Sequence, residues 1–269
     1  MHAVLNVAIM AAREAASVIN RYSSQIERVN TRDKGANQIV SEVDIIAEES
    51  IINIIRQHFS DHKITSEEGT AGEQPAPAAG EKEYEWIIDP LDGTHNYLHG
   101  FPYYCISIGI KFDGKIEHAV VMDPVRQEIF SASRGSGAHV DNQRIRVSKT
   151  RRLSEALLST GMPFRDPADI KSWLRSYASV IPRAQSVHRV GASALDMAYV
   201  AAGRYDGLWQ LGLKQWDMCA GALLIQEAGG LITDIDGKQN FLETGTIVCG
   251  NDKIHEKLLQ LVQSQIKPA

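Results

Sequence analysis

The sequence has few cysteines and no long apolar run. Its three cysteines, Cys105, Cys219 and Cys249, are odd in number and widely spaced, which is typical of reduced cytosolic thiols and argues against a disulfide framework. No apolar stretch predicts a membrane span, and the first residues lack a signal-peptide pattern. We therefore expect a cytoplasmic protein that does not bind membranes.

Concentrated charge is also missing. The 28 Lys and Arg residues are offset by 33 Asp and Glu residues, for a net charge of −5, and no long basic run occurs. Because nucleic-acid binders usually carry a basic patch, the sequence indicates no direct nucleic-acid binding. Apolar residues are plentiful: 43% of 269 residues are hydrophobic, which suits one large or two small domains with a full core.

Secondary-structure patterns divide the chain into two halves. After two predicted helices and an antiparallel meander, strand and helix alternate from about residue 148 onward. We expect residues 1–147 to form an α+β half with a metal-binding turn, and residues 148–269 to form an α/β half that completes the active site. Residues 31–37 are predicted as a loop, and residues 70–83, rich in Ala, Pro, Gly and Glu, as a mobile loop.

The stretch at 86–96, WIIDPLDGTHN, concentrates oxygen ligands and backbone amides in one turn. A β-branched strand leads into Asp89, and a proline forces the chain to turn before Asp92. Gly93 and Thr94 follow, with amides that can face an anion. Such oxygens suit hard divalent cations and such amides suit phosphate. The alternative is an ordinary exposed turn, which Asp-Pro and Asp-Gly pairs also mark.

Three further acidic residues stand at the ends of predicted elements. Glu67 follows a short strand, Asp217 opens a helix, and Asp44 lies in the first turn of another helix. Each has a structural alternative: a solvated loop charge for Glu67, and helix capping for Asp44 and Asp217. Taken with the two aspartates of the turn, they describe a metal-assisted phosphoryl-transfer site.

These motifs resemble those of the inositol monophosphatase family, and within it the bacterial inositol-1-monophosphatases. The resemblance covers essentially the whole chain and rests on two long segments, WIIDPLDGTHN at 86–96 and WDMCAGALLIQEAGG at 216–230. It implies an α+β fold, a layered α-β-α-β-α sandwich with an antiparallel sheet in the first half and a smaller mixed sheet in the second. It also implies a Mg²⁺-dependent, lithium-sensitive phosphatase that forms a homodimer.

The resemblance also implies a role for individual residues. Glu67 and Thr94 would hydrogen-bond the attacking water, and Asp44 would orient Thr94 from behind. The implied metal ligands are Glu67, Asp89, the Leu91 carbonyl, Asp92 and Asp217. The implied substrate contacts are Leu91, Asp92, Gly93, Thr94, His188, Gln210 and Asp217.

Two positions depart from the family pattern. Gln210 stands where many members place a glutamate on the sugar-ring hydroxyls, and a neutral amide loses the charge-assisted part of that bond. His95 stands where threonine is usual, and we assign it no catalytic role. His188 and Arg189 are expected either at the substrate or at a subunit interface.

The sequence leaves the substrate open. The expected reaction is hydrolysis of inositol-1-phosphate or a related small polyol phosphate by a metal-activated water. The same chemistry on fructose 1,6-bisphosphate, histidinol phosphate, 3′-phosphoadenosine 5′-phosphate or NADP is the alternative. A different class, an interaction protein in transcription complexes, also stays open, because an intact acidic set does not exclude a second protein partner.

Overall fold

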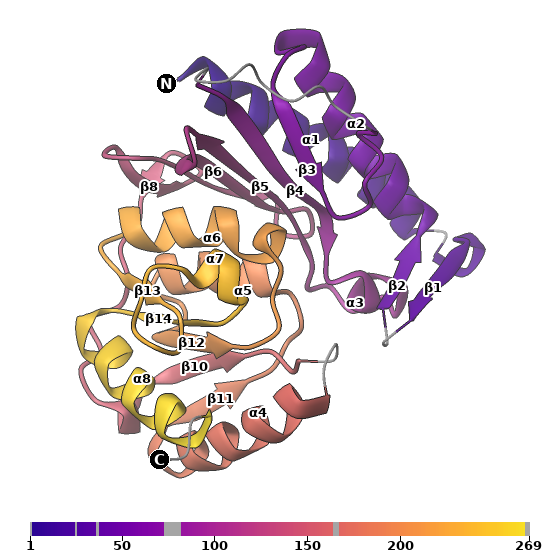
Figure 1. Ribbon diagram of the computed structural model, residues 1–269. Helices are drawn as coiled ribbons and strands as arrows, with labels where there is room; N and C mark the ends of the chain where they lie inside the picture. Colours follow the sequence, from indigo (N-terminus) through magenta and orange to yellow (C-terminus); the bar gives the residue numbers. More distant parts are fainter. Residues whose placement is uncertain (1, 25, 36–37, 73–81, 164–166, 267–269) are drawn as a thin grey trace.

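The chain folds into alternating layers of helices and sheets (Figure 1) in a computed structural model that describes residues 2–24, 26–35, 38–72, 82–163 and 167–266. One pair of helices covers the outer face of a larger sheet, a second pair lies between the two sheets, and a third covers the outer face of the smaller sheet. This arrangement confirms the predicted α-β-α-β-α sandwich. In that order the helices are α1 (Ala3–Ser23), α2 (Glu42–His58), α5 (Ser193–Ala201), α6 (Gln215–Glu227), α4 (Pro167–Val180) and α8 (Asp252–Ile266).

The larger sheet has seven strands in sequence order, β3-β4-β5-β6-β7-β8-β9. Neighbouring strands of this sheet are antiparallel, except for the edge pair β3 and β4, which is parallel. The predicted antiparallel sheet is thus confirmed from β4 onward. The strands are β3 (Lys63–Ser66), β4 (Tyr84–Asp92), β5 (Cys105–Phe112), β6 (Lys115–Asp123), β7 (Glu128–Ser133), β8 (Gly137–Val140) and β9 (Gln143–Arg144).

The smaller sheet is mixed, as predicted, with the order β11-β10-β12-β14-β13. Strand β10 is parallel to both its neighbours, whereas β14 is antiparallel to both of its own. The strands are β10 (Leu157–Thr160), β11 (Ser186–His188), β12 (Gly207–Gln210), β13 (Leu231–Thr233) and β14 (Ile247–Gly250).

The predicted loop at 31–37 was wrong in part. Strands β1 (Thr31–Gly35) and β2 (Gln38–Ser41) pair antiparallel there. The polar composition of the segment favours a loop, but the hydrogen bonds between the two strands stabilise an extended backbone. Of the predicted mobile loop at 70–83, residues 73–81 lie outside the described part of the chain, so its mobility stays a prediction.

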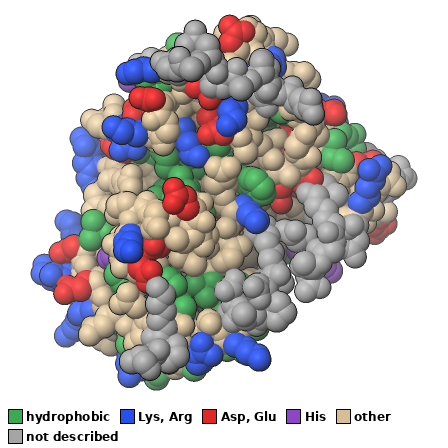
Figure 2. Space-filling view, viewed as in Figure 1, with side chains coloured by type: hydrophobic (Ala, Val, Ile, Leu, Met, Phe, Trp, Pro, Cys, Tyr) green, Lys and Arg blue, Asp and Glu red, His purple; other side chains and the backbone are tan. Residues whose placement is uncertain are grey.

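Helix α1 is long and apolar enough, by length and composition, to cross a membrane. However, 56% of its most apolar window is buried inside the protein, as in a core helix. Its fully buried alanines, Ala8, Ala11, Ala12 and Ala15, allow close packing against α2 and β6. On the face shown in Figure 2, basic and acidic side chains are interspersed.

Candidate active site

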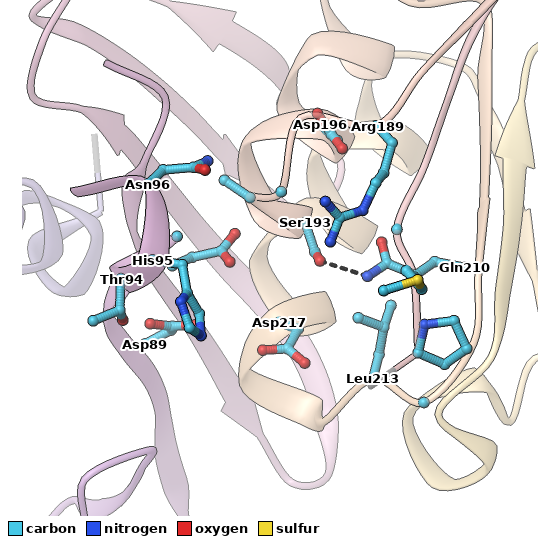
Figure 3. A pocket seen from close by; sticks show the side chains of 18 of the residues that line it. Asp89, Thr94, His95, Asn96, Arg189, Ser193, Asp196, Gln210, Leu213 and Asp217 are labelled. Carbon is cyan, nitrogen blue, oxygen red and sulfur yellow. Dashed lines mark hydrogen bonds between the residues drawn. The ribbon is translucent and has the colours of Figure 1, made fainter. Parts of the chain in front are cut away.

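A cavity of about 590 Å³ opens between the end of β4 and the second half of the chain (Figure 3). One wall comes from β4 and the short helix α3 (Thr94–Leu98), and the other from α5, β12, α6 and the segment after β10. Most of the predicted site residues line it, namely Glu67, Asp89, Leu91, Asp92, Gly93, Thr94, Gln210 and Asp217.

The alternation of side chains along β4 determines where its acids point. Both faces of this strand are buried: Ile88 packs on the α1–α2 side, and Ile87 packs in the core that contains α6. Because neighbouring residues face opposite sides of a sheet, Asp89 lies on the same side as Ile87 and so faces α6, which carries Asp217. The apolar strand thus aims the first carboxylate at the second half of the chain.

The end of β4 and the glycine that follows it have specific local geometry. The Asp89 carboxylate accepts the Leu91 amide at 3.1 Å. Gly93 has φ of +100°, and a Cβ there would lie 3.1 Å from the Tyr103 carbonyl oxygen, so this position requires glycine. The chain then enters α3 at Thr94.

Glu67 reaches the same place from β3. Its amide donates to the Ile88 carbonyl at 3.1 Å, which extends the β3–β4 pairing by one residue and brings Glu67 beside Asp89. Burial raises the pKa of Asp89 well above its usual range, and the charge of Glu67 raises it further, as do the other acids nearby. For Asp92, burial and then the charge of Asp217 raise the pKa in the same way.

The acids share a cavity without forming a compact cluster. Within the described residues, no group of three or more His, Cys, Asp or Glu side chains could already hold a metal ion. Burial, and then repulsion by the neighbouring acids, nevertheless raises the pKa values of Asp89 and Asp92. A bound cation would relieve that repulsion, so the donor set fits a hard divalent ion by its chemistry.

Asp44 lies behind the cavity and holds Thr94. It forms the predicted capping box of α2, in which its Oδ2 accepts the Ser41 amide at 2.9 Å. Its Oδ1 accepts the Thr94 hydroxyl at 2.8 Å, and the Leu91 carbonyl offers that hydroxyl a second acceptor at 3.1 Å. Because the hydroxyl proton is directed to these acceptors, the lone pairs of the Thr94 oxygen can still accept a hydrogen bond from another group.

The opposite wall is mostly neutral. Gln210 donates through Nε2 to the Ser193 hydroxyl at 2.8 Å, and its Oε1 is buried with no partner in the described part of the chain. A Cβ at Gly161 would collide with the Gln210 amide, so glycine at 161 makes room for it. In Figure 3, Gln210, Ser193 and Arg189 face Asp89 and Thr94 across the cavity.

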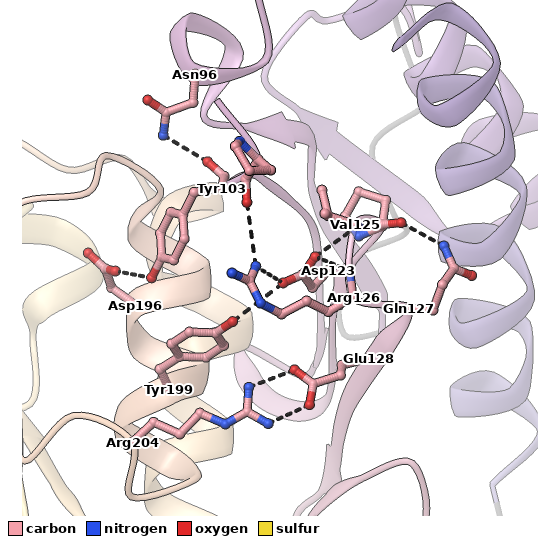
Figure 4. Close-up of polar contacts among 12 residues, drawn as sticks. Asn96, Tyr103, Asp123, Val125, Arg126, Gln127, Glu128, Asp196, Tyr199 and Arg204 are labelled. Carbon is pink, nitrogen blue, oxygen red and sulfur yellow. Dashed lines mark hydrogen bonds and ion pairs between the residues drawn. The ribbon is translucent and has the colours of Figure 1, made fainter. Parts of the chain in front are cut away.

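Hydrogen bonds tie the two walls together. Asp92 accepts the Ala194 amide at the start of α5, at 2.7 Å. Asn96 donates to the carbonyls of Tyr103 at 2.7 Å and Val190 at 2.9 Å. The Tyr103 hydroxyl in turn donates to the buried Asp196 carboxylate at 2.5 Å (Figure 4). These bonds fix the spacing of the walls.

Two predicted residues need separate comment. Asp217 does cap its helix, because its Oδ2 accepts the Lys214 amide at 2.8 Å, and it also lines the cavity. His188 is exposed and is not among the lining residues, and its ring packs edge-on against Tyr205. Successive residues of an extended chain point to opposite sides, so Arg189 faces the cavity in its place.

Several lining residues were missed from the sequence. Ser193, Asn96 and Gly161 are small or neutral and carry no charge pattern, although Gly161 directly follows β10. Asp196 had a usable signal, since it is an acid in an otherwise apolar helix. Burial raises its pKa to about 7, against hydrogen bonds from Tyr103 and Ser159, which lower it.

Comparisons with known proteins find relatives along the whole chain. The chain matches the inositol monophosphatase family over residues 1–267. It is 46% identical to "Nus factor SuhB" of Pseudomonas aeruginosa, over 100% of this chain and 99% of that protein. Among solved structures, the extragenic suppressor protein suhB from Bartonella henselae aligns with a TM-score of 0.91 and 37% identity, over 97% of this chain and 99% of that one. Inositol monophosphatase from Anabaena aligns with a TM-score of 0.84 and 34% identity, over 97% and 96%. The chain therefore belongs to the inositol monophosphatase family.

Proposed function

We propose that this protein is a Mg²⁺-dependent phosphomonoesterase that hydrolyses inositol-1-phosphate or a similar small polyol phosphate. Membership of the family implies a phosphatase. The observation that carries the proposal is the convergence of four acids on one cavity beside the Gly93–Thr94 turn, because such acids suit cations and such amides suit phosphate.

The ligands of the proposed ions are residues of this chain, and two of these residues serve more than one ion. Glu67, Asp89 and the Leu91 carbonyl would hold the first Mg²⁺. Asp89, Asp92 and Asp217 would hold the second, and Glu67 with waters would hold a third. When bound, Mg²⁺ supplies Lewis-acid polarisation of water and of the phosphoryl oxygens.

The chain's own groups position the reactants. Thr94 directs its proton toward Asp44 and the Leu91 carbonyl, so its oxygen is left to accept a hydrogen bond from the attacking water. Glu67 would accept the other proton of that water. The amides of Gly93 and Thr94 would bind the phosphate. No covalent intermediate on the protein is required.

The opposite wall supports a hydroxyl-rich leaving group. The buried Oε1 of Gln210 is an acceptor without a partner among the described residues, and leaving such a group unsatisfied is costly. A ring or polyol hydroxyl would satisfy it. Small polyol phosphates therefore match this wall.

The test is hydrolysis of a panel of phosphate esters with and without Mg²⁺. The panel should include inositol-1-phosphate, glycerol 2-phosphate, fructose 1,6-bisphosphate, histidinol phosphate, 3′-phosphoadenosine 5′-phosphate and NADP. We expect Mg²⁺-dependent phosphate release that is fastest with the small polyol esters. Release that is equal with and without the ion would refute the metal mechanism, and a preference for the nucleotides would refute the substrate class.

We propose a second role, in transcription, because relatives such as the Pseudomonas aeruginosa protein carry the name "Nus factor". The variant Asp92→Asn separates the two roles, since it should lose hydrolysis and keep its surface. Co-purification of this variant with transcription complexes, at the level of the wild type, would support a role that does not need turnover. Loss of both hydrolysis and co-purification in this variant would show that the transcription role depends on an intact active site.

The homodimer stays a prediction that sedimentation can check.

A further inference from the structure

Glu48 is a buried carboxylate that the proposed reaction does not use. It lies on α2 one helical turn after Asp44, and its exposed fraction is 0%. The next residue, Glu49, is exposed on the same helix. Burying a carboxylate is costly unless hydrogen bonds satisfy it, so the partners of Glu48 show what its burial achieves.

Among the described residues, the hydrogen bonds to Glu48 come from the short segment that carries Glu67. Its Oε1 accepts the Ser66 hydroxyl at 2.8 Å, the Thr70 amide at 2.7 Å and the Thr70 hydroxyl at 2.8 Å. Its Oε2 accepts the Glu68 amide at 2.9 Å. The donors therefore flank Glu67 on both sides and fold the chain around one carboxylate.

Helix α2 thus anchors two parts of the cavity wall from the same face. Residues four apart lie above one another on a helix, so Asp44 and Glu48 point toward the sheet together. Asp44 holds Thr94. Glu48 holds the Ser66 side chain before Glu67 and the Glu68 and Thr70 amides after it. Thr94 and Glu67 are the two groups proposed to hydrogen-bond the attacking water.

We propose that Glu48 is a positioning residue that sets the Glu67 carboxylate for metal binding and for orienting the water. This rests on the proposed function, in which Glu67 is a metal ligand. Partners that orient metal ligands are typically worth about 10–100-fold in metal affinity. Glu48 is the acid that supplies this support from behind the ligand, as Asp44 supplies it to Thr94.

The amide analogue distinguishes positioning from simple packing. A carboxylate accepts on both oxygens, whereas glutamine keeps the shape but accepts on one and presents an NH₂ group on the other side. In Glu48→Gln, that NH₂ must face either the Glu68 amide or the three donors at Oε1. At least one hydrogen bond is lost, and two donors oppose each other.

The experiment compares Glu48→Gln with its matched control Glu49→Gln, the same change at the exposed neighbour. Two quantities are measured without substrate: hydrogen exchange of the Glu68 and Thr70 amides, and Mn²⁺ affinity by titration calorimetry. For Glu48→Gln we expect exchange of these amides at least about 10-fold faster, with α1 unchanged, and Mn²⁺ affinity about 10-fold weaker. Glu49→Gln should match the wild type in both.

Two further variants separate this inference from the proposed function. If Glu48 acts through Glu67, the double variant Glu48→Gln/Glu67→Gln should bind Mn²⁺ no more weakly than Glu67→Gln alone. Additive losses would overturn the inference. If Glu67→Gln alone binds Mn²⁺ like the wild type, the metal assignment of the proposed function fails, and amide exchange alone then decides whether Glu48 holds the segment.

A folding failure of Glu48→Gln would not end the test. Thr70→Val removes one donor to Glu48 and conserves the shape of the side chain, so it should shift exchange and Mn²⁺ affinity in the same direction by a smaller factor. Wild-type exchange at both the Glu68 and the Thr70 amides, in a folded Glu48→Gln or Thr70→Val protein, would overturn the inference.

Discussion

The two walls of the cavity are built in different ways. On the β4 side, acids stand at the ends of strands and are fixed by backbone pairing and by α2 from behind. On the other side, Gln210 and Ser193 are neutral, a glycine at 161 leaves space for Gln210, and Asp217 on α6 is the acid that completes the set. The acidic wall is thus suited to ions and phosphate, and the neutral wall to the rest of the substrate. Substitutions on the first should therefore change turnover, and substitutions on the second should change affinity.

The largest expected effect is on the acidic wall, in Asp92→Asn. We expect kcat to fall by a factor on the order of 10² or more, because an amide is a poorer ligand for a hard cation and transition-state stabilisation is lost. The fold should persist, because asparagine can still accept the Ala194 amide. Steady-state kinetics and a thermal melt measure both, with Asp113→Asn on an exposed turn as the control. Near-normal turnover in a folded variant would remove Asp92 from the metal site.

A smaller loss is expected from Asp44→Asn, which acts through Thr94. Asparagine can turn its NH₂ toward the Thr94 hydroxyl, which then accepts where it had donated, so one of the two lone pairs of that oxygen is occupied and its orientation toward the water changes. We expect kcat to fall about 10-fold, with Mn²⁺ affinity unchanged, since Asp44 is not a proposed ligand. An equal loss of metal affinity would show that Asp44 supports the ion site instead of Thr94.

The sequence predicted the acidic wall better than the neutral one, for a physical reason. Asp89, Asp92 and Gly93 lie within one short turn, where spacing along the chain determines spacing in the cavity. The opposite wall collects Gly161, Ser193 and Gln210 from separate elements. These side chains carry no charge, and only the packing of α5 against the smaller sheet brings them together.

Glu48 shows a different limit of sequence reasoning. It is one of several acids on a helix with a mixed polar pattern, and its neighbour Glu49 looks equivalent in the sequence. Only the path of residues 66–70 beside α2 separates the buried residue from the exposed one. The layered fold itself was predictable because its strands and helices have clear periodicities and because its motifs resemble those of a known family.

The neutral wall is tested by Gln210→Glu. A carboxylate restores charge-assisted acceptance of a ring hydroxyl, which is worth on the order of 1 kcal/mol, so KM for inositol-1-phosphate should fall about 5-fold at constant kcat. The Ser193 hydroxyl can rotate to donate to the new carboxylate. Gln185→Glu, at an exposed position, is the control. A change in kcat with KM unchanged would contradict the division of labour between the walls.

The smallest expected effect on catalysis comes from His118, a buried residue on β6. Burial and then the nearby His2 lower its pKa to about 4. The unfolded chain takes up this proton near pH 6.5 and the folded chain only near pH 4, so stability falls as the pH drops between these values. The loss should be at most about 3 kcal/mol.

Urea unfolding at pH 7 and pH 4 checks this for the wild type and His118→Gln. The variant should lose less stability over that interval and should keep the kcat and KM of the wild type at pH 7. An identical loss in both proteins would show that His118 does not set the acid limit.

The central claim is that the acids of the β4 wall, together with Asp217 on α6, bind divalent ions. The most direct measurement is anomalous scattering from crystals soaked in Mn²⁺, which can occupy Mg²⁺ sites. We predict peaks within ligand distance of Asp89, Asp92 and Asp217, and a further peak beside Glu67. Strong peaks elsewhere with none at these acids, in crystals of a protein whose hydrolysis depends on Mn²⁺, would contradict the account.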